Sequence, residues 1–175
     1  MIHICYVINK NYIGQFKVSA LSLLKNTKEL VTFHILQSDL KLEDKEDLIL
    51  FFKKYNSIVQ FYELSDELFV GLPKMNQDQS YTAYYKVFIP NVLKNLDKVL
   101  YLDADIIING DIQKLYDIDT NQKLISCVLD KKINKKRKDH VLKINGLENT
   151  YFNSGVLLFD FKYHQAIKNE TEIKS

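Results

Sequence analysis

The strongest chemical feature of the sequence is a pair of carboxylates, Asp103 and Asp105. Residues 99–102 before the pair and residues 106–108 after it are apolar or aromatic. Residues two apart on an extended backbone project to one side, so the two negative charges would lie close together and repel. A divalent cation such as Mg²⁺ or Mn²⁺ relieves that repulsion and commonly bridges carboxylates to phosphate oxygens. The pair therefore indicates a metal site for a phosphate-bearing ligand.

Two other interpretations of the pair stay open from the residues alone. Asp103 and Asp105 could be incidental acids of a solvated turn, or they could belong to a haloacid-dehalogenase-like phosphatase that forms an aspartyl-phosphate on Asp103. Such phosphatases place their pair after the first strand, whereas several predicted elements precede Asp103 here. An EF-hand is excluded, because isoleucines follow Asp105 and no glutamate closes the loop.

Short apolar runs typical of buried strands alternate with longer segments that have helical spacing. We predict strands at residues 2–8, 31–36, 58–64, 99–102, 124–129 and 151–161, and helices at residues 12–25, 42–55, 81–96 and from residue 165 onward. Pro90 should end or bend the helix at 81–96, and residues 65–79 should form a loop with a short helical turn. The pattern predicts a single α/β domain over residues 1–175, with a mostly parallel sheet flanked by helices.

Ligands of such sheets gather at the carboxyl ends of strands, near a switch in strand order. Two polar features lie at predicted strand ends: the break around Asn9 after the first strand, and the Asp103 pair. We expect them to meet at one edge of the sheet. Asn109-Gly110 is the strongest turn signal in the chain and should follow this region.

Bulk composition is that of an ordinary globular protein with a net charge of +2 and a single arginine, Arg137. This balance gives no reason to expect nucleic acid as a partner. Cys5 and Cys127 lie in apolar runs and are expected to be buried thiols, and His3 and His34 alternate with strand residues and are expected to be structural. With no signal peptide and no membrane-spanning run in the sequence, we expect a cytoplasmic protein.

A basic run begins at Lys131 and ends at Lys138, with six positive charges in eight residues. It is expected either to be a solvated loop or to contact an anionic acceptor or the inner face of a membrane.

Several stretches resemble the family 8 glycosyltransferases, a group of retaining hexosyltransferases related to lipopolysaccharide galactosyl- and glucosyltransferases and to glycogenin. They are TAYYKVFIP from Thr82, DKVLYLDAD from Asp97, GDI from Gly110 and YFNSGVLLF from Tyr151. The resemblance runs through nearly the whole chain in order. It implies the Rossmann-like nucleotide-sugar-binding domain called GT-A. The implied activity is transfer of glucose or galactose from UDP-glucose or UDP-galactose, with retention, to a saccharide or glycolipid acceptor of the lipopolysaccharide type.

The resemblance also implies roles for individual residues. Asp103 and Asp105 are similar to the family's ligands of Mn²⁺ (or Mg²⁺), which holds the diphosphate of the UDP-sugar. The implied nucleotide-binding residues are Val7, Asn9, Asn11, Tyr12, Lys86 and Ala104, and the implied donor-sugar residues are Asp130, Asn153, Ser154 and Gly155. A glycine inside a strand often marks the close approach of a ligand or a backbone, although a bulge at Gly155 is an equally good reading of the residues alone. No catalytic nucleophile is assigned.

The sequence departs from the family pattern at several points. Asn9 stands where the family commonly has Asp, and Lys86 stands where it usually has Arg, which loses a bidentate contact. The family's third metal ligand, a histidine, and a phosphate-binding lysine would follow Ser175, and neither His140 nor His164 lies in a matching context. A catalytically incomplete remnant or nucleotide-sugar-binding module is therefore an alternative function.

Overall fold

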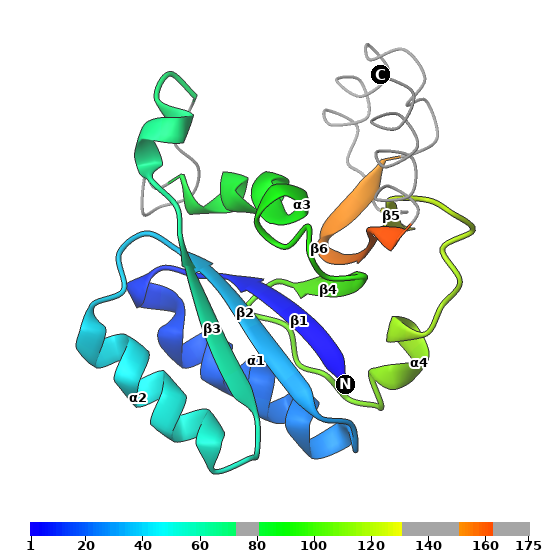
Figure 1. Cartoon of the computed structure of the whole chain (residues 1–175), viewed down its shortest axis with the longest axis horizontal. Coiled ribbons are helices and arrows are strands. Elements are labelled where there is room, and N and C mark those ends of the chain that lie inside the picture. The colour runs from blue at the N-terminus through cyan, green and yellow to red at the C-terminus, as the bar shows by residue number, and fades with distance from the viewer. Residues whose placement is uncertain (73–80, 131–150, 163–175) are drawn as a thin grey trace.

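The computed structural model describes residues 1–72, 81–130 and 151–162, and its organising element is a six-stranded sheet (Figure 1). The strands have the order β3-β2-β1-β4-β6-β5. Their bounds are β1 Ile2–Val7, β2 Val31–Gln37, β3 Ile58–Glu63, β4 Lys98–Leu102, β5 Ile125–Leu129 and β6 Phe152–Asp160. Strands β1 to β4 are mutually parallel, and β6 runs antiparallel to both β4 and β5. The predicted mixed α/β fold with a mostly parallel sheet is confirmed.

Helices cover both faces of the sheet. The connections from β1 to β3 contain α1 (Ile13–Asn26) and α2 (Leu42–Lys53), which lie together on one face in Figure 1. The connection from β3 to β4 contains the 3₁₀ helices η2 (Asp66–Phe69) and η3 (Thr82–Phe88) and the short helix α3 (Ile89–Val92), and α3 lies on the other face. The face changes because right-handed crossovers that move in opposite directions along a sheet place their helices on opposite sides.

Each face of the sheet has its own apolar core. Under α1 and α2, the rings of Tyr6 and Phe16 have centroids 4.9 Å apart, as do those of Phe33 and Phe52. The opposite core surrounds Tyr85, whose ring stacks on Phe69 and whose hydroxyl donates a hydrogen bond to Asp66. These two cores hold the central strands rigidly, and so they fix the positions of the loops at the strand ends.

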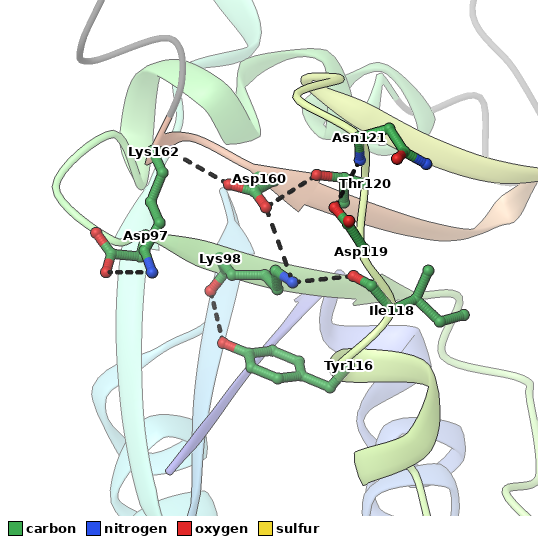
Figure 2. Close-up of polar contacts among 9 residues, drawn as sticks. All are labelled: Asp97, Lys98, Tyr116, Ile118, Asp119, Thr120, Asn121, Asp160 and Lys162. Atoms are coloured by element: carbon green, nitrogen blue, oxygen red, sulfur yellow. Dashed lines mark hydrogen bonds and ion pairs between the residues drawn. The ribbon is translucent and has the colours of Figure 1, made fainter.

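A polar network at the amino end of β4 fixes its pairing with β6 (Figure 2). Lys98 and Asp160 are register partners, and their charged groups lie 3.8 Å apart with most of each side chain buried. Thr120 donates a 3.0 Å hydrogen bond to Asp160, and Lys98 donates to the carbonyl of Ile118. The Tyr116 hydroxyl, from the short helix α4 (Gln113–Tyr116), donates to the carbonyl of Lys98. The same register brings Gly155 beside Asp103 at the other end of β4, where the Asp103 N–H donates to the Gly155 carbonyl at 2.8 Å.

Three local predictions differ from the structure. Residues 81–96 do not form one helix: η3 continues into α3, which ends at Val92, and Pro90 lies in the first turn of α3. The turn predicted at Asn109-Gly110 is only a bend at residue 110, and residues 106–108 before it form no strand; the backbone N–H of residue 108 donates to Ser22 on α1. Cys127 is exposed, because β5 is the outermost strand of the sheet, whereas Cys5 is buried as expected.

The helix expected from residue 165 and the basic run from Lys131 to Lys138 lie outside the described residues. Within the residues that the structure describes, no helix has the length and apolar character needed to cross a membrane.

Candidate functional site

A cavity of about 310 Å³ opens between the carboxyl ends of β1 and β4. This is the point where the strand order switches, since the chain continues from β1 toward β2 and β3 on one side and returns to β4 on the other. The residues that line the cavity come from the ends of β1 and β4 and from η3. They are Val7, Asn9, Tyr12, Thr82, Ala83, Lys86, Tyr101, Asp103, Ala104 and Asp105.

The wall that follows β1 is shaped by Asn9. Its side-chain oxygen accepts a 3.0 Å hydrogen bond from the Asn11 N–H, which caps the 3₁₀ helix η1 (Lys10–Tyr12). Asparagine suits this position because a short side-chain oxygen can reach back to the backbone N–H groups that begin a helix. Val7 and Tyr12 line the cavity on either side of this turn, whereas Asn11 is exposed and is not among the lining residues.

The wall that follows β4 is a turn containing Asp103, Ala104 and Asp105. The backbone is not extended here, because the Ile106 N–H donates to the Asp103 carbonyl across the turn. The prediction that alternation along a strand places both carboxylates on one side is therefore wrong in its geometry. Both side chains nevertheless line the cavity, with Asp103 half-buried and Asp105 exposed.

Positive charge and a hydrogen-bond donor surround one oxygen of Asp103. The buried hydroxyl of Tyr101 donates to Asp103 Oδ1 at 2.5 Å, and Lys86 Nζ lies 3.4 Å from the same oxygen. The Lys86 ammonium also lies 4.9 Å from the centre of the Tyr101 ring, which places it over the negative face of the aromatic system. Burial, followed by the charge of Asp103, raises the pKa of the Tyr101 phenol well above its usual value, so the phenol remains a donor.

Two residues of the cavity lining, Lys86 and Asp103, contact Ser154 and Gly155 of β6. Lys86 Nζ lies 3.3 Å from both the carbonyl and the hydroxyl oxygen of Ser154. The β5–β6 ladder shifts register between Cys127 and Val128, which leaves Ser154 and Gly155 outside regular pairing with β5. A bulge and a close approach of another group therefore both occur at Gly155.

Five predicted site residues are not among the cavity-lining residues: Asn11, Ser154 and Gly155, described above, and Asn153 and Asp130. Asn153 is exposed, and its side-chain oxygen accepts a hydrogen bond from the Gly155 N–H. Asp130 follows β5, and its backbone N–H donates to the carbonyl of Tyr151. Neither residue is among those lining the cavity between β1 and β4.

Three lining residues received no role from the sequence: Thr82, Ala83 and Tyr101. Thr82 and Ala83 precede Lys86 by four and three residues, so on a helix they share its face and could have been expected beside it. Tyr101 lies near the end of β4, two residues before Asp103 in the turn, and a tyrosine in an apolar strand gives no separate signal of a role.

The donor set fits a hard divalent cation. Asp103 and Asp105 supply carboxylate oxygens, which Mg²⁺ and Mn²⁺ prefer. Asp103 Oδ2 accepts no hydrogen bond from any residue that the structure describes, so none of those residues competes with a cation for this oxygen. In the described part of the chain, no group of three or more His, Cys, Asp or Glu side chains is placed to hold a metal. Asp103 and Asp105 are therefore the acidic ligands that the described residues offer in the cavity.

His3 and His34 lie in the sheet and are not among the cavity lining, as expected for structural residues. His140 and His164 lie outside the described residues.

The fold matches solved glycosyltransferase structures of the GT-A class. A structure of the galactosyltransferase LgtC in complex with donor and acceptor sugar analogs has a TM-score of 0.75 at 23% identity, over 98% of this chain and 63% of that one. An active-site mutant of LgtC has a TM-score of 0.77 at 22% identity, over 94% of this chain and 59% of that one. The structure therefore has the GT-A glycosyltransferase fold.

Residues 3–172 match the sequence profile of glycosyl transferase family 8, and the chain belongs to this family. It is 31% identical over 162 residues to the lipopolysaccharide 1,3-galactosyltransferase of Salmonella typhimurium, covering 90% of this chain and 48% of that protein. It is 28% identical to a lipopolysaccharide 1,2-glucosyltransferase of Escherichia coli, covering 91% and 48%. The chain thus spans about half the length of these relatives. The family match leaves the phosphatase interpretation without support.

Proposed function

We propose that the chain binds a UDP-hexose, UDP-glucose or UDP-galactose, in the cavity between β1 and β4. The hexose is then transferred with retention to a saccharide or lipopolysaccharide-type acceptor. The observation that carries the proposal is the meeting of Asp103, Asp105 and Lys86 with the turn after β1 at the switch in strand order. Parallel sheets bind nucleotides at this place, and the mixture of charges suits a diphosphate held beside a cation.

In this proposal, Asp103 and Asp105 hold Mn²⁺ or Mg²⁺. A divalent cation, when bound, neutralises the charge that develops on a departing diphosphate. Lys86 supplies a second positive charge in the same region, since its ammonium already lies between Asp103 and Ser154. As a lysine it acts on phosphate as a point charge, without the planar fork of an arginine.

The turn after β1 is proposed to bind the uridine. The apolar Val7 and the ring of Tyr12 offer surfaces for a base and a ribose, and the buried Asn9 holds the turn in shape through its cap on η1. Ala104, which is small and nearly buried, leaves room between the two aspartates. Asn11 acts through its backbone, because its N–H is the group that Asn9 accepts from.

The donor sugar is proposed to lie toward β6. The Ser154 hydroxyl contacts the Lys86 ammonium, and Gly155 lies beside the Asp103 carboxylate; Lys86 and Asp103 both line the cavity. The Asn153 side-chain oxygen accepts a hydrogen bond from the Gly155 N–H, and Asp130 directly follows β5, the strand that pairs with Asn153. The proposed contact of the run from Lys131 to Lys138 with an anionic acceptor or membrane rests on its charge.

A nucleotide-sugar-binding module with incomplete catalysis is the second candidate. The observation in its favour is that the described residues provide two acidic metal ligands and no third His, Cys, Asp or Glu beside them. This candidate predicts binding without turnover, which separates it from the first.

A UDP-release assay tests the proposed function. With Mn²⁺ present, the chain should release UDP from UDP-glucose or UDP-galactose and should not release ADP from ADP-glucose. Chelation by EDTA, or the double change Asp103→Asn and Asp105→Asn, should abolish release. Glu46→Gln on the exposed side of α2 is the matched control and should behave like the unmodified chain. Binding of UDP without release would support the binding module. If the chain neither bound nor released UDP, both candidates would be refuted.

A further inference from the structure

The two oxygens of the Asp103 carboxylate have different surroundings. Oδ1 accepts the 2.5 Å hydrogen bond from Tyr101 and lies 3.4 Å from Lys86 Nζ. Oδ2 accepts no hydrogen bond from the described residues and faces the backbone of Gly155. A carboxylate that is free to rotate would exchange these two oxygens, so something must hold it in one orientation.

Tyr101 provides the first constraint. Its side chain is 2% exposed and packs in the core with Cys5, Val99 and Leu157, so its hydroxyl cannot follow a moving partner. A hydrogen bond to a charged acceptor is stronger than one between neutral groups. The phenol therefore fixes Oδ1 toward the interior of the protein.

Gly155 provides the second constraint. A Cβ atom placed on Gly155 would lie 2.7 Å from Asp103 Oδ2 and 3.3 Å from Asp103 Cγ. The backbones cannot separate to relieve this contact without breaking the hydrogen bond from the Asp103 N–H to the Gly155 carbonyl. The N–H of Gly155 is also held, by the side chain of Asn153 at 2.8 Å. Any side chain at position 155 would thus displace the carboxylate itself.

We propose that Tyr101 and Gly155 are positioning residues that hold the Asp103 carboxylate with Oδ1 bound to the protein and Oδ2 presented to a divalent cation. This inference rests on the proposed function, because it presumes that the cavity binds the cation. It gives Gly155 a role toward the metal ligand in place of the contact with the donor sugar that the family resemblance implied. Groups that orient a ligand in this way commonly change metal affinity by about 10- to 100-fold when they are altered.

The experiment measures Mn²⁺ affinity by electron paramagnetic resonance, which follows free Mn²⁺ and does not depend on turnover. Tyr101→Phe removes the hydroxyl and keeps the ring, and Gly155→Ala adds the methyl group that would meet Oδ2. Each should weaken Mn²⁺ binding by about tenfold or more. Gly14→Ala is the matched control for the glycine, because a Cβ there meets nothing within 4 Å, and Tyr62→Phe is the control for the tyrosine.

A double-mutant cycle separates positioning from a general loss of structure. In a chain that already carries Asp103→Asn, the change Tyr101→Phe should cost no further Mn²⁺ affinity, because the ligand that it positions is gone. Equal losses in both backgrounds would overturn the inference, as would unchanged Mn²⁺ affinity in both single variants. If Gly155→Ala unfolds the chain, the Tyr101→Phe cycle still decides. An unmodified chain that binds no Mn²⁺ would instead refute the proposed function, and with it this inference.

Discussion

Around Asp103, a lysine and a proposed cation compete for the same negative charge. Lys86 Nζ lies 3.4 Å from Asp103 Oδ1, and its side chain is largely buried. A positive charge at this distance repels a divalent cation but attracts the phosphates of a nucleotide. The effect of Lys86 on the two ligands should therefore have opposite signs.

The variant Lys86→Met tests this opposition. Without nucleotide, Mn²⁺ should bind more tightly, by about fivefold, because removal of a nearby like charge in a partly buried site is worth about 1 kcal/mol. With Mn²⁺ saturating, UDP should bind about tenfold more weakly, because one charge-assisted contact to phosphate is lost. Titration calorimetry measures both affinities.

Lys45→Met is the control for this test, since Lys45 is on α2 and pairs with Glu63 outside the cavity. The account of Lys86 would be contradicted if Lys86→Met weakened the binding of both ligands or of neither.

Much of the site could be inferred from single residues in the sequence. Two aspartates after an apolar run, and an asparagine after the first strand, indicate polar groups at strand ends whatever the details of the turn. Tyr101 could not be recognised in the same way, because a tyrosine in an apolar run is most often a core residue. The role of Tyr101 depends on the hydrogen bond from its hydroxyl to Asp103, and this bond forms because the turn after β4 brings the Asp103 carboxylate to the hydroxyl.

At the scale of the elements, a line of hydrogen bonds crosses three neighbouring strands. The Tyr62 hydroxyl on β3 donates to Gln60 and therefore accepts from His34 Nδ1 at 3.0 Å. His34 Nε2 on β2 then accepts from His3 Nδ1 on β1, also at 3.0 Å. A proton added to His34 Nε2 would place two N–H groups against each other. Burial, with the adjacent His3 charge as a smaller cause, accordingly lowers the pKa of His34 to about 4.

This arrangement predicts that the fold loses stability in mild acid. The pKa of His34 is about 4 in the folded chain and about 6.5 when it is unfolded, so the stabilisation is complete above pH 6.5 and is lost as the pH falls toward 4. Between these values the unfolded chain binds a proton that the folded chain does not. The loss should be about 1–3 kcal/mol in the free energy of unfolding.

Urea denaturation of the unmodified chain and of His34→Gln, at several pH values from 7.5 to 4.5, measures this loss. Glutamine does not titrate, so the free energy of unfolding of the variant should decline less steeply with falling pH. A smaller decline should remain because of His3, whose pKa is also lowered. Identical pH dependence in the two chains would contradict the account. The carboxylates titrate in both chains and cancel in the comparison.

The elements themselves were predicted well where an apolar period was long and uninterrupted. Strands β1, β2 and β3 and helices α1 and α2 lie close to their predicted bounds. Residues 81–96 were misjudged because they pack aromatic side chains against the sheet as successive 3₁₀ turns, and the spacing of 3₁₀ and α turns is too similar to separate over so few residues. The turn at Asp103 was not predicted because no glycine or proline marks it, and apolar residues both precede and follow the two aspartates.

At the scale of the whole molecule, the site is a consequence of topology. The order β3-β2-β1-β4 puts the ends of β1 and β4 side by side, although Val7 and Leu102, which end these strands, are 95 positions apart in the sequence. Alternation of strands and helices predicts a parallel sheet and a site at strand ends, but it does not predict the order of the strands. It also gives no sign that β6 enters between β4 and β5 in the opposite direction, since a buried strand is apolar whichever way it runs.

The antiparallel strand β6 is what completes the site. Its pairing with β4 is fixed at one end by Lys98 and Asp160, and at the other end it brings Gly155 and Ser154 to Asp103 and Lys86. The switch point alone would give a polar cleft. The addition of β6 gives an oriented carboxylate with a lysine beside it.

The central claim is that UDP binds this cavity through a cation held by Asp103 and Asp105, and titration calorimetry of UDP into the chain tests it most directly. The account predicts binding heat in the presence of Mn²⁺, little or none in EDTA, and loss of the Mn²⁺-dependent heat when both aspartates are changed to asparagine. UDP that bound equally well in Mn²⁺ and in EDTA, or equally well after the loss of both carboxylates, would contradict it.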